Sequence, residues 1–229
     1  MALISVIIPT LDEATQIGPC LDQFAAQLGD WELVVVDGGS RDGTVALAEA
    51  RGARVIQASG GRGPQMNAGA AAAEGWILLF LHADGRLPPH ASRLIHRILA
   101  CPGIAAGAFR VRHQPHRWTG TWKARLLRLA DLRSRYTRRP YGDQGLFMNR
   151  SIFQAAGGFP PRPLMEDLAM ARRLARLGRV HTVREEVRTS GRRFESAPIR
   201  AFLCMNTFPV LDRLGVSPER LKRWYGNPR

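Results

Sequence analysis

Residues 34–44 read Val-Val-Val-Asp-Gly-Gly-Ser-Arg-Asp-Gly-Thr, a β-branched run that ends in an acidic, glycine-rich turn. A continuous run of this kind is typical of a strand buried on both faces of a sheet. Asp37 stands where this strand ends, and in open α/β sheets ligands bind at that edge. A second strand-like run ends in His82-Ala83-Asp84, and a third acidic motif is Met165-Glu166-Asp167. Together the three motifs predict a nucleotide site, a metal site and a base.

The first half of the chain alternates between strand-like and helical patterns. Strands are predicted at residues 4–8, 32–36, 53–57 and 76–81, and helices at residues 13–28, 42–51, 64–73 and 88–100. This alternation predicts an α/β fold with a Rossmann-like, mostly parallel sheet flanked by helices. Beyond it, strands are predicted at 105–111 and 145–149, and helices at 118–135 and 166–177.

Length and composition indicate one compact domain, because 229 residues at 45% hydrophobic can bury a substantial core. We predict a domain over residues 1–195, in which residues 1–104 bind the nucleotide and residues 105–195 shape the site for a second substrate, the acceptor. Residues 196–229 are predicted to form a helical extension packed on this domain.

Targeting signals are absent from the sequence as given. Its start lacks the basic region and cleavage site of a secretory signal. The apolar stretch at residues 199–216 is interrupted by charges and a proline, and it falls short of the roughly 20 apolar residues of a spanning helix. Cys20, Cys101 and Cys204 lack the spacing of a zinc or redox pair. We therefore expect a cytoplasmic protein without a transmembrane span, for which peripheral contact with the inner face of the membrane and the oligomeric state stay open.

The formal charge of +14 favours partners that carry phosphate or an anionic surface. Residues 110–139 hold ten basic side chains against the single acid Asp131. Nucleic acid is one candidate partner, but the segment matches no known nucleic-acid-binding motif. We therefore expect no nucleic-acid partner, and a solvated arginine-rich face is the competing interpretation.

Several of these segments resemble the family 2 glycosyltransferases, which have the GT-A fold. The segment from Ser5 to Glu13 is similar to that family's first strand and nucleotide loop, residues 32–44 to its second strand and Asp-Gly-Gly-Ser-x-Asp-Gly-Thr motif, and residues 62–69 to its basic turn before the third helix. The sequence also resembles a bacterial subgroup that has a His-Ala-Asp metal motif and is associated with arsenosugar biosynthesis. The resemblance implies a nucleotide-diphosphate-sugar donor, with UDP favoured, a hydroxyl acceptor, and Mn²⁺ or Mg²⁺ as cofactor.

The resemblance also implies a set of donor-binding residues. Asp37 would hold the N–H of the base, although a plain turn role is the alternative. Arg62, next to two glycines, would bind phosphate, unless it is a solvated loop residue. The implied nucleotide-sugar site comprises Pro9, Thr10, Leu11, Glu13, Asp37, Gly39, Arg62, Gln65, Asp84 and Arg193.

Asp84 is the expected metal ligand, because a diphosphate leaving group carries charge that a hard divalent cation neutralises. His82 replaces the first acid of the family's usual Asp-x-Asp motif. We predict it as a second ligand, and a hydrogen bond to the backbone is the alternative role.

Asp167 is the expected catalytic base, since an attacking hydroxyl must lose its proton to a group within hydrogen-bond reach. Glu166 is expected to act with Asp167 and to orient the acceptor, and Gln144 to contact it. A favourable charge at a helix start is the alternative role for both acids. One direct attack would invert the anomeric centre. The competing functions are a nucleotidyltransferase and a basic nucleic-acid-binding protein.

Overall fold

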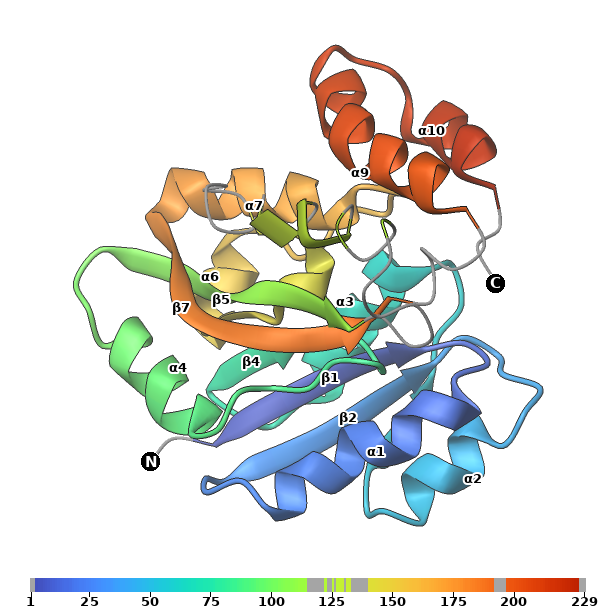
Figure 1. The fold of residues 1–229 in the computed structure, drawn as a ribbon. Helices are drawn as coiled ribbons and strands as arrows, with labels where there is room; N and C mark the ends of the chain where they lie inside the picture. The colour runs from blue at the N-terminus through green and yellow to red at the C-terminus, as the bar shows by residue number, and fades with distance from the viewer. Residues whose placement is uncertain are drawn as a thin grey trace.

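A computed structural model describes residues 3–114, 122, 125, 127–129, 131–132, 140–191 and 197–226 of the chain. The strands are β1 (Ile4–Thr10), β2 (Trp31–Asp37), β3 (Arg54–Gln57), β4 (Ile77–Phe80), β5 (Ile104–Gln114), β6 (Leu146–Asn149) and β7 (Arg179–Ser190). They form one sheet in the order β3-β2-β1-β4-β6-β5-β7 (Figure 1). Among the described strands only β6 runs antiparallel to its neighbours, β4 and β5. The predicted α/β fold with a mostly parallel sheet is therefore confirmed.

Helices cover both faces of this sheet and bury a separate core on each (Figure 1). One core packs α1 (Ala14–Ala25), α2 (Thr44–Glu49) and α4 (Ala91–Leu99) against the strand side chains on one face of the sheet. The other core packs α3 (Arg62–Ala72), α6 (Arg150–Ala155) and α7 (Glu166–Leu177) against the strand side chains on the opposite face. Alternation along a strand explains the division: in β1, Val6 and Ile8 belong to the first core and Ile7 to the second.

Helix α3 lies unusually close to the sheet. A Cβ at Gly69 would come within 2.8 Å of Val36 Cγ2 and would also collide with Ile7, so only glycine fits there. This close approach brings the start of α3, with Arg62, to the edge where β1 and β2 end.

Two elements of the second half were not assigned from the sequence. The long strand β7 pairs in parallel with β5, and the short α6 follows β6 directly. Just before β6, η1 (Gly142–Gln144) forms a single 3₁₀ turn. The helix predicted at residues 118–135 falls mostly outside the described residues.

The C-terminal extension consists of α9 (Pro198–Arg213) and α10 (Pro218–Tyr225), as the sequence predicts. Its own small core joins Phe208 and Leu221 to Met165, the residue before α7. Asp212 is buried and bonds two arginines, Arg162 Nη1 at 2.9 Å and Arg172 Nη2 at 2.5 Å. The extension is thus fixed beside α7. Within the described part of the chain, no helix combines the length and the apolar character needed to cross a membrane.

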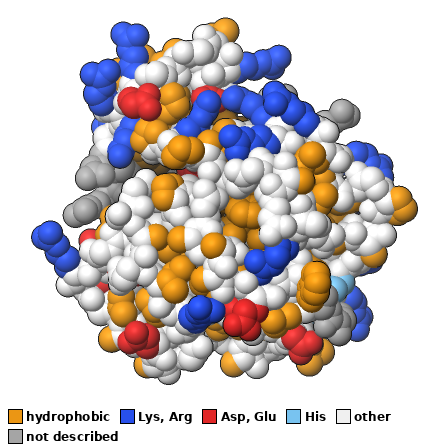
Figure 2. All heavy atoms as spheres, turned by 180° about the vertical axis from the view of Figure 1, so that it is seen from behind, with side chains coloured by type: hydrophobic (Ala, Val, Ile, Leu, Met, Phe, Trp, Pro, Cys, Tyr) orange, Lys and Arg blue, Asp and Glu red, His pale blue; other side chains and the backbone are white. Residues whose placement is uncertain are grey.

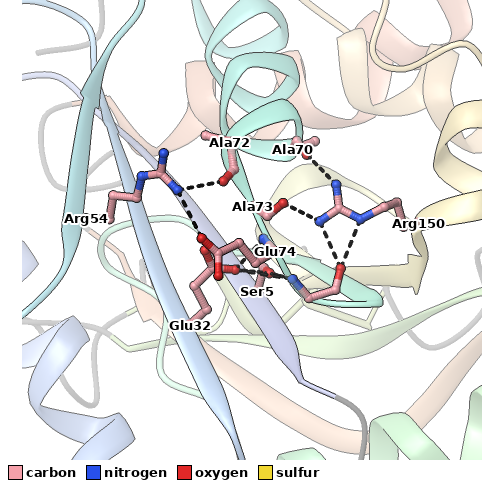
Figure 3. Close-up of polar contacts among 9 residues, drawn as sticks. Ser5, Glu32, Arg54, Ala70, Ala72, Ala73, Glu74 and Arg150 are labelled. Carbon is pink, nitrogen blue, oxygen red and sulfur yellow. Dashed lines mark hydrogen bonds and ion pairs between the residues drawn. The ribbon is translucent and has the colours of Figure 1, made fainter.

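Arg150 ties the turn between α3 and β4 to the start of α6. Figure 3 shows its guanidinium bonded to three backbone carbonyls: Nη1 to Ala70 O at 3.0 Å, Nη2 to Ala73 O at 2.5 Å, and Nε and Nη2 to Gly75 O at 3.0 and 2.9 Å. These carbonyls include acceptors that the end of a helix leaves without intrahelical partners. On the other side of the same turn, Glu32 accepts a hydrogen bond from Glu74 N at 2.8 Å.

We expect Arg150→Met to lower the free energy of unfolding by about 2 kcal/mol, because it removes charged hydrogen bonds to carbonyls inside the fold. Urea denaturation measures the change. Arg93→Met, at an exposed position on α4, is the matched control and should stay within about 0.5 kcal/mol of the wild type. Equal stability of the Arg150 and Arg93 variants would contradict this prediction.

Candidate active site

Hydrogen bonds in both directions connect the two loops at the carboxyl ends of β1 and β2. Asp12 N donates to Ser40 Oγ at 2.8 Å, and Arg41 N donates back to Asp12 Oδ1 at 2.8 Å. Further along, Ala14 N donates to Asp42 Oδ2 at 3.0 Å, so Asp42 also holds the start of α1. The two loops therefore form one rigid edge where the sequence predicts the nucleotide.

Asp37 lies at this edge with only 1% of its surface exposed. Its Oδ2 accepts hydrogen bonds from Gly39 N and Ser40 N, both at 2.9 Å, and its Oδ1 from Ser40 Oγ. Burial acts to raise the pKa of Asp37, but the bonds from Ser40 and Gly39 outweigh it and hold this pKa below its ordinary value. These contacts are those of a turn residue, and the contact between Asp37 and a base stays a prediction.

The other residues predicted around the base divide into buried supports and accessible groups. Gln65 Nε2 donates to Thr10 O and Val36 O, both at 2.9 Å, so the buried Gln65 amide holds the two strand ends together. Thr10 is buried as well. In this structure the side chains of Gln65 and Thr10 support the two strand ends from inside the fold, and their contact with the nucleotide stays a prediction. The accessible groups are Leu11, which is 46% exposed, together with Pro9, Glu13 and Gly39.

A cleft of about 150 Å³ lies beside this edge. It brings together five of the predicted residues: Arg62, His82, Asp84, Glu166 and Asp167. They come from the start of α3, the segment after β4 and the start of α7, so only the folded chain assembles them. Arg193, another predicted residue, lies outside the described residues.

Asp167 is held in place by two backbone amides. Gly142 N donates to its Oδ2 and Leu168 N to its Oδ1, both at 2.7 Å. Burial raises the pKa of Asp167; the two amides and Arg62 oppose this, the charge of Asp143 adds to it, and the net direction is upward. A carboxylate with a raised pKa is a stronger base, and its fixed geometry suits proton transfer from a hydroxyl in the cleft.

Asp84 and His82 reach the same cleft from the end of β4. Asp84 Oδ2 accepts a hydrogen bond from Ser190 N at 3.3 Å, and His82 Nε2 lies close to Gly142. Among the described residues, no three His, Cys, Asp or Glu side chains are grouped as a ready metal cage. Mg²⁺ is commonly held by one or two carboxylates together with substrate phosphates, so this donor set fits a cation that arrives with a diphosphate.

Two further residues line the cleft that are not among the predicted site residues, His113 and Asp143, and Asp131 contacts His113. His113 Nδ1 lies 2.5 Å from Asp131 Oδ1, and its Nε2 lies 3.6 Å from Asp143 Oδ2. Burial acts to lower the pKa of His113, but the hydrogen bond to Asp131 and the charge of Asp143 raise it overall. His113 belongs to no recognisable motif, so the sequence does not indicate a role for it. Asp143 directly precedes Gln144, the residue of this segment that the sequence predicts as an acceptor contact.

Gln144, which is predicted to contact the acceptor, is fully buried. Its Nε2 donates to Phe109 O at 2.8 Å, and its Oε1 accepts from Tyr141 N at 2.8 Å. Both ends of the amide are therefore used inside the fold, where Gln144 shapes the turn that carries Asp143, and its contact with an acceptor stays a prediction.

The remaining wall of the cleft is apolar and is contributed largely by the C-terminal extension. Its residues are Leu164, Met165, Ala201, Cys204, Met205, Phe208, Pro209 and Tyr225. The cleft thus combines a charged side, which suits phosphates and hydroxyl chemistry, with an apolar side.

Comparison with known proteins gives consistent matches. The profile described as Glycosyl transferase family 2 matches residues 5–157. A PGL/p-HBAD biosynthesis glycosyltransferase of Mycobacterium bovis is 33% identical over 171 residues, covering 69% of this chain and 63% of that protein. An undecaprenyl-phosphate 4-deoxy-4-formamido-L-arabinose transferase of Pseudomonas aeruginosa is 31% identical over 168 residues, covering 67% of this chain and 49% of that protein. The chain thus spans less than two thirds of the length of these relatives.

Two solved structures have a similar fold. A mannosyltransferase of Pyrobaculum calidifontis in complex with GDP-Man and Mn²⁺ superposes with a TM-score of 0.68 at 20% identity, covering 97% of this chain and 68% of that chain. A glucosyl-3-phosphoglycerate synthase of Mycobacterium tuberculosis in complex with Mn²⁺, UDP and glucosyl-3-phosphoglycerate superposes with a TM-score of 0.62 at 22% identity, covering 94% and 81%. At such identities the likeness establishes the fold.

Proposed function

The chain belongs to glycosyl transferase family 2 and has the GT-A fold, and from this premise we propose that it transfers a sugar from a nucleotide-diphosphate donor to an acceptor hydroxyl with inversion. A UDP-linked donor is favoured. The observation that carries the proposal is the cleft in which Arg62, Asp84 and Asp167 meet at the edge of the nucleotide loops. We further assign the chain to the bacterial subgroup with the His-Ala-Asp motif, and the arsenosugar pathway associated with that subgroup stays a prediction.

In this proposal Asp167 accepts the proton of the acceptor hydroxyl as its oxygen attacks the anomeric carbon. The two amides that bind its carboxylate leave further lone pairs of both oxygens available, because each carboxylate oxygen accepts more than one hydrogen bond. Glu166, which begins α7 beside it, orients the acceptor. A single displacement with this one base inverts the anomeric centre.

The leaving diphosphate is met by positive charge on two sides. Asp84, with His82, would hold a divalent cation, which supplies charge neutralisation for the departing diphosphate. Arg62 stands at the N-terminus of α3, where the helix dipole also favours an anion. The base of the nucleotide would lie on the two hydrogen-bonded loops that follow β1 and β2, against Leu11 and the turn around Gly39.

We also propose peripheral contact with an anionic membrane through the C-terminal extension. Figure 2 shows Lys and Arg side chains gathered near the top of the molecule, with hydrophobic side chains among them. The exposed basic residues of the extension are Arg200, Arg213, Arg220, Lys222 and Arg223, and its exposed apolar residues are Ile199, Leu203, Val210, Leu214 and Trp224. Such a surface is attracted to anionic headgroups. The protein should float with phosphatidylglycerol vesicles at low salt, and equal flotation with phosphatidylcholine vesicles, or none, would refute the contact.

The function is tested by calorimetric binding of UDP, GDP, dTDP and CMP, each with and without Mn²⁺. We expect one nucleotide to bind and its affinity to depend on the cation. The matching sugar nucleotides are then assayed for release of the nucleotide upon transfer or hydrolysis. If no nucleotide binds under either condition, the chain is not an active glycosyltransferase.

A further inference from the structure

Asp143 lines the same cleft as the proposed base, one residue after Gly142, whose amide binds Asp167. Its side chain is only 21% exposed. One oxygen, Oδ2, faces His113 Nε2 at 3.6 Å. The other, Oδ1, is buried and has no hydrogen-bond partner within the described ranges of the chain. A buried carboxylate oxygen without a partner is costly, so a ligand that satisfies it gains affinity.

His113 fixes the orientation of this carboxylate. Its ring is itself held by Asp131, through Nδ1 at 2.5 Å, and its backbone N donates to Asp131 Oδ2 at 3.1 Å. A carboxylate thus faces each ring nitrogen, Asp131 at Nδ1 and Asp143 at Nε2, and both favour the charged form of the ring. Asp143 Oδ2 therefore lies toward His113, and Oδ1 is the carboxylate oxygen that can accept a hydrogen bond from a ligand in the cleft.

Thr189 supplies a second, independent polar group. It pairs with His113 in the register of β5 and β7, and it is only 4% exposed. Its Oγ1 also lacks a hydrogen-bond partner among the residues described, and the side chain lines the same cleft. The cleft lining therefore contains two buried oxygens without a hydrogen-bond partner among the described residues, one from Asp143 and one from Thr189.

The chemistry of these oxygens selects the ligand. A phosphate placed directly against Asp143 is disfavoured, because the Asp143 carboxylate would repel its negative charge. A neutral polyol fits: one hydroxyl donates to Asp143 Oδ1, and a neighbouring hydroxyl exchanges a hydrogen bond with Thr189. Position then favours the donor, since Thr189 directly precedes Ser190, whose amide bonds the Asp84 carboxylate at 3.3 Å. The sugar of a sugar nucleotide is joined directly to the diphosphate that Asp84 is proposed to meet.

We propose that Asp143 and Thr189 form a subsite for hydroxyls of the transferred sugar, with His113 as the residue that positions Asp143. This inference rests on the proposed function. According to this inference, the contacts of Asp143 and Thr189 with the sugar add to the affinity for the donor, separately from the contacts that bind the nucleotide.

The test compares a sugar nucleotide with its own nucleoside diphosphate by calorimetry in Mn²⁺, using UDP-glucose, UDP-GlcNAc and GDP-mannose against UDP and GDP. In the wild type we expect at least one sugar nucleotide to bind more tightly than its diphosphate. Asp143→Asn and Thr189→Val should each weaken that sugar nucleotide about tenfold and leave the diphosphate within about twofold. His113→Gln should give a smaller loss with the same selectivity.

Thermal melting of each variant checks that it folds, and Thr189→Val covers the case in which Asp143→Asn does not. Equal losses for sugar nucleotide and diphosphate would overturn the inference, as would unchanged affinity for both. A higher KM for an acceptor with unchanged donor binding would move the subsite to the acceptor and also overturn it. If the wild type binds none of the nucleotides, the proposed function itself fails. If the wild type binds a sugar nucleotide and the variants bind it with unchanged affinity, only the inferred subsite fails.

Discussion

Asp167→Asn should reduce kcat about 10²- to 10⁴-fold, the range by which a positioned general base accelerates proton transfer. Asparagine keeps the shape of the side chain and can still accept a hydrogen bond from Gly142 N, but it cannot take a proton from the acceptor. Donor binding should therefore change little while turnover collapses. The measurement is steady-state release of the nucleoside diphosphate under saturating donor.

The wild type should also show the titration of this base in its pH profile. Because the pKa of Asp167 is raised above the ordinary value of 3.8, and because the base works in its deprotonated form, kcat/KM should rise with pH through that raised pKa. Asp22→Asn on the exposed face of α1 is the matched control and should retain the wild-type rate and profile. An Asp167→Asn enzyme with more than half of the wild-type kcat would exclude Asp167 as the base.

Asp84→Ala should abolish the effect of Mn²⁺ on nucleotide binding and lower kcat/KM by about 10²-fold or more, because several kcal/mol of charge stabilisation are lost with the cation. The wild type treated with a chelator should behave like the variant. Calorimetry of the bound nucleotide with and without Mn²⁺, on both proteins, gives the comparison directly.

His82→Asn distinguishes the two roles considered for the histidine in the same experiment. If His82 binds the cation, the variant should show a weaker Mn²⁺ dependence than the wild type. If the ring only bonds nearby backbone, the Mn²⁺ dependence should be unchanged. A Mn²⁺ effect that persists in full in Asp84→Ala would remove Asp84 from the cation site.

The sequence was most informative where strands are buried on both faces. In β1 and β2 the β-branched runs are continuous, because helices cover both sides of the sheet, and such runs stand out without an alignment. Strand β7 was not assigned a range because Arg184, Glu185 and Glu186 interrupt its apolar positions, and its pairing with β5 contains register shifts that break the period of two. The charged side chains of such a strand face outward, and tertiary pairing decides its structure.

The site was predictable where a motif ends a strand or begins a helix. Arg62, Asp84 and Asp167 were predicted from the chemistry of their motifs together with the resemblance to the family, and the fold brings them into one cleft. A motif does not distinguish an amide that binds a ligand from one that bonds backbone carbonyls, and only the folded structure shows that the side chains of Gln65 and Gln144 are buried and bonded to backbone. His113 and Thr189 could not be found at all, since they meet Asp143 only through the pairing of strands 76 residues apart in the chain.

The C-terminal extension has an evolutionary consequence. The family profile ends at residue 157, so α9 and α10, which build the apolar wall of the cleft, lie outside it. They are held by their own small core, by the packing of α9 on Leu127, and by Asp212 with its two arginines. Mutations there leave the donor-binding edge untouched while they reshape what lies against the apolar wall. Lineages can therefore alter the apolar wall by exchanging this one segment, while the loops at the ends of β1 and β2 are inherited unchanged.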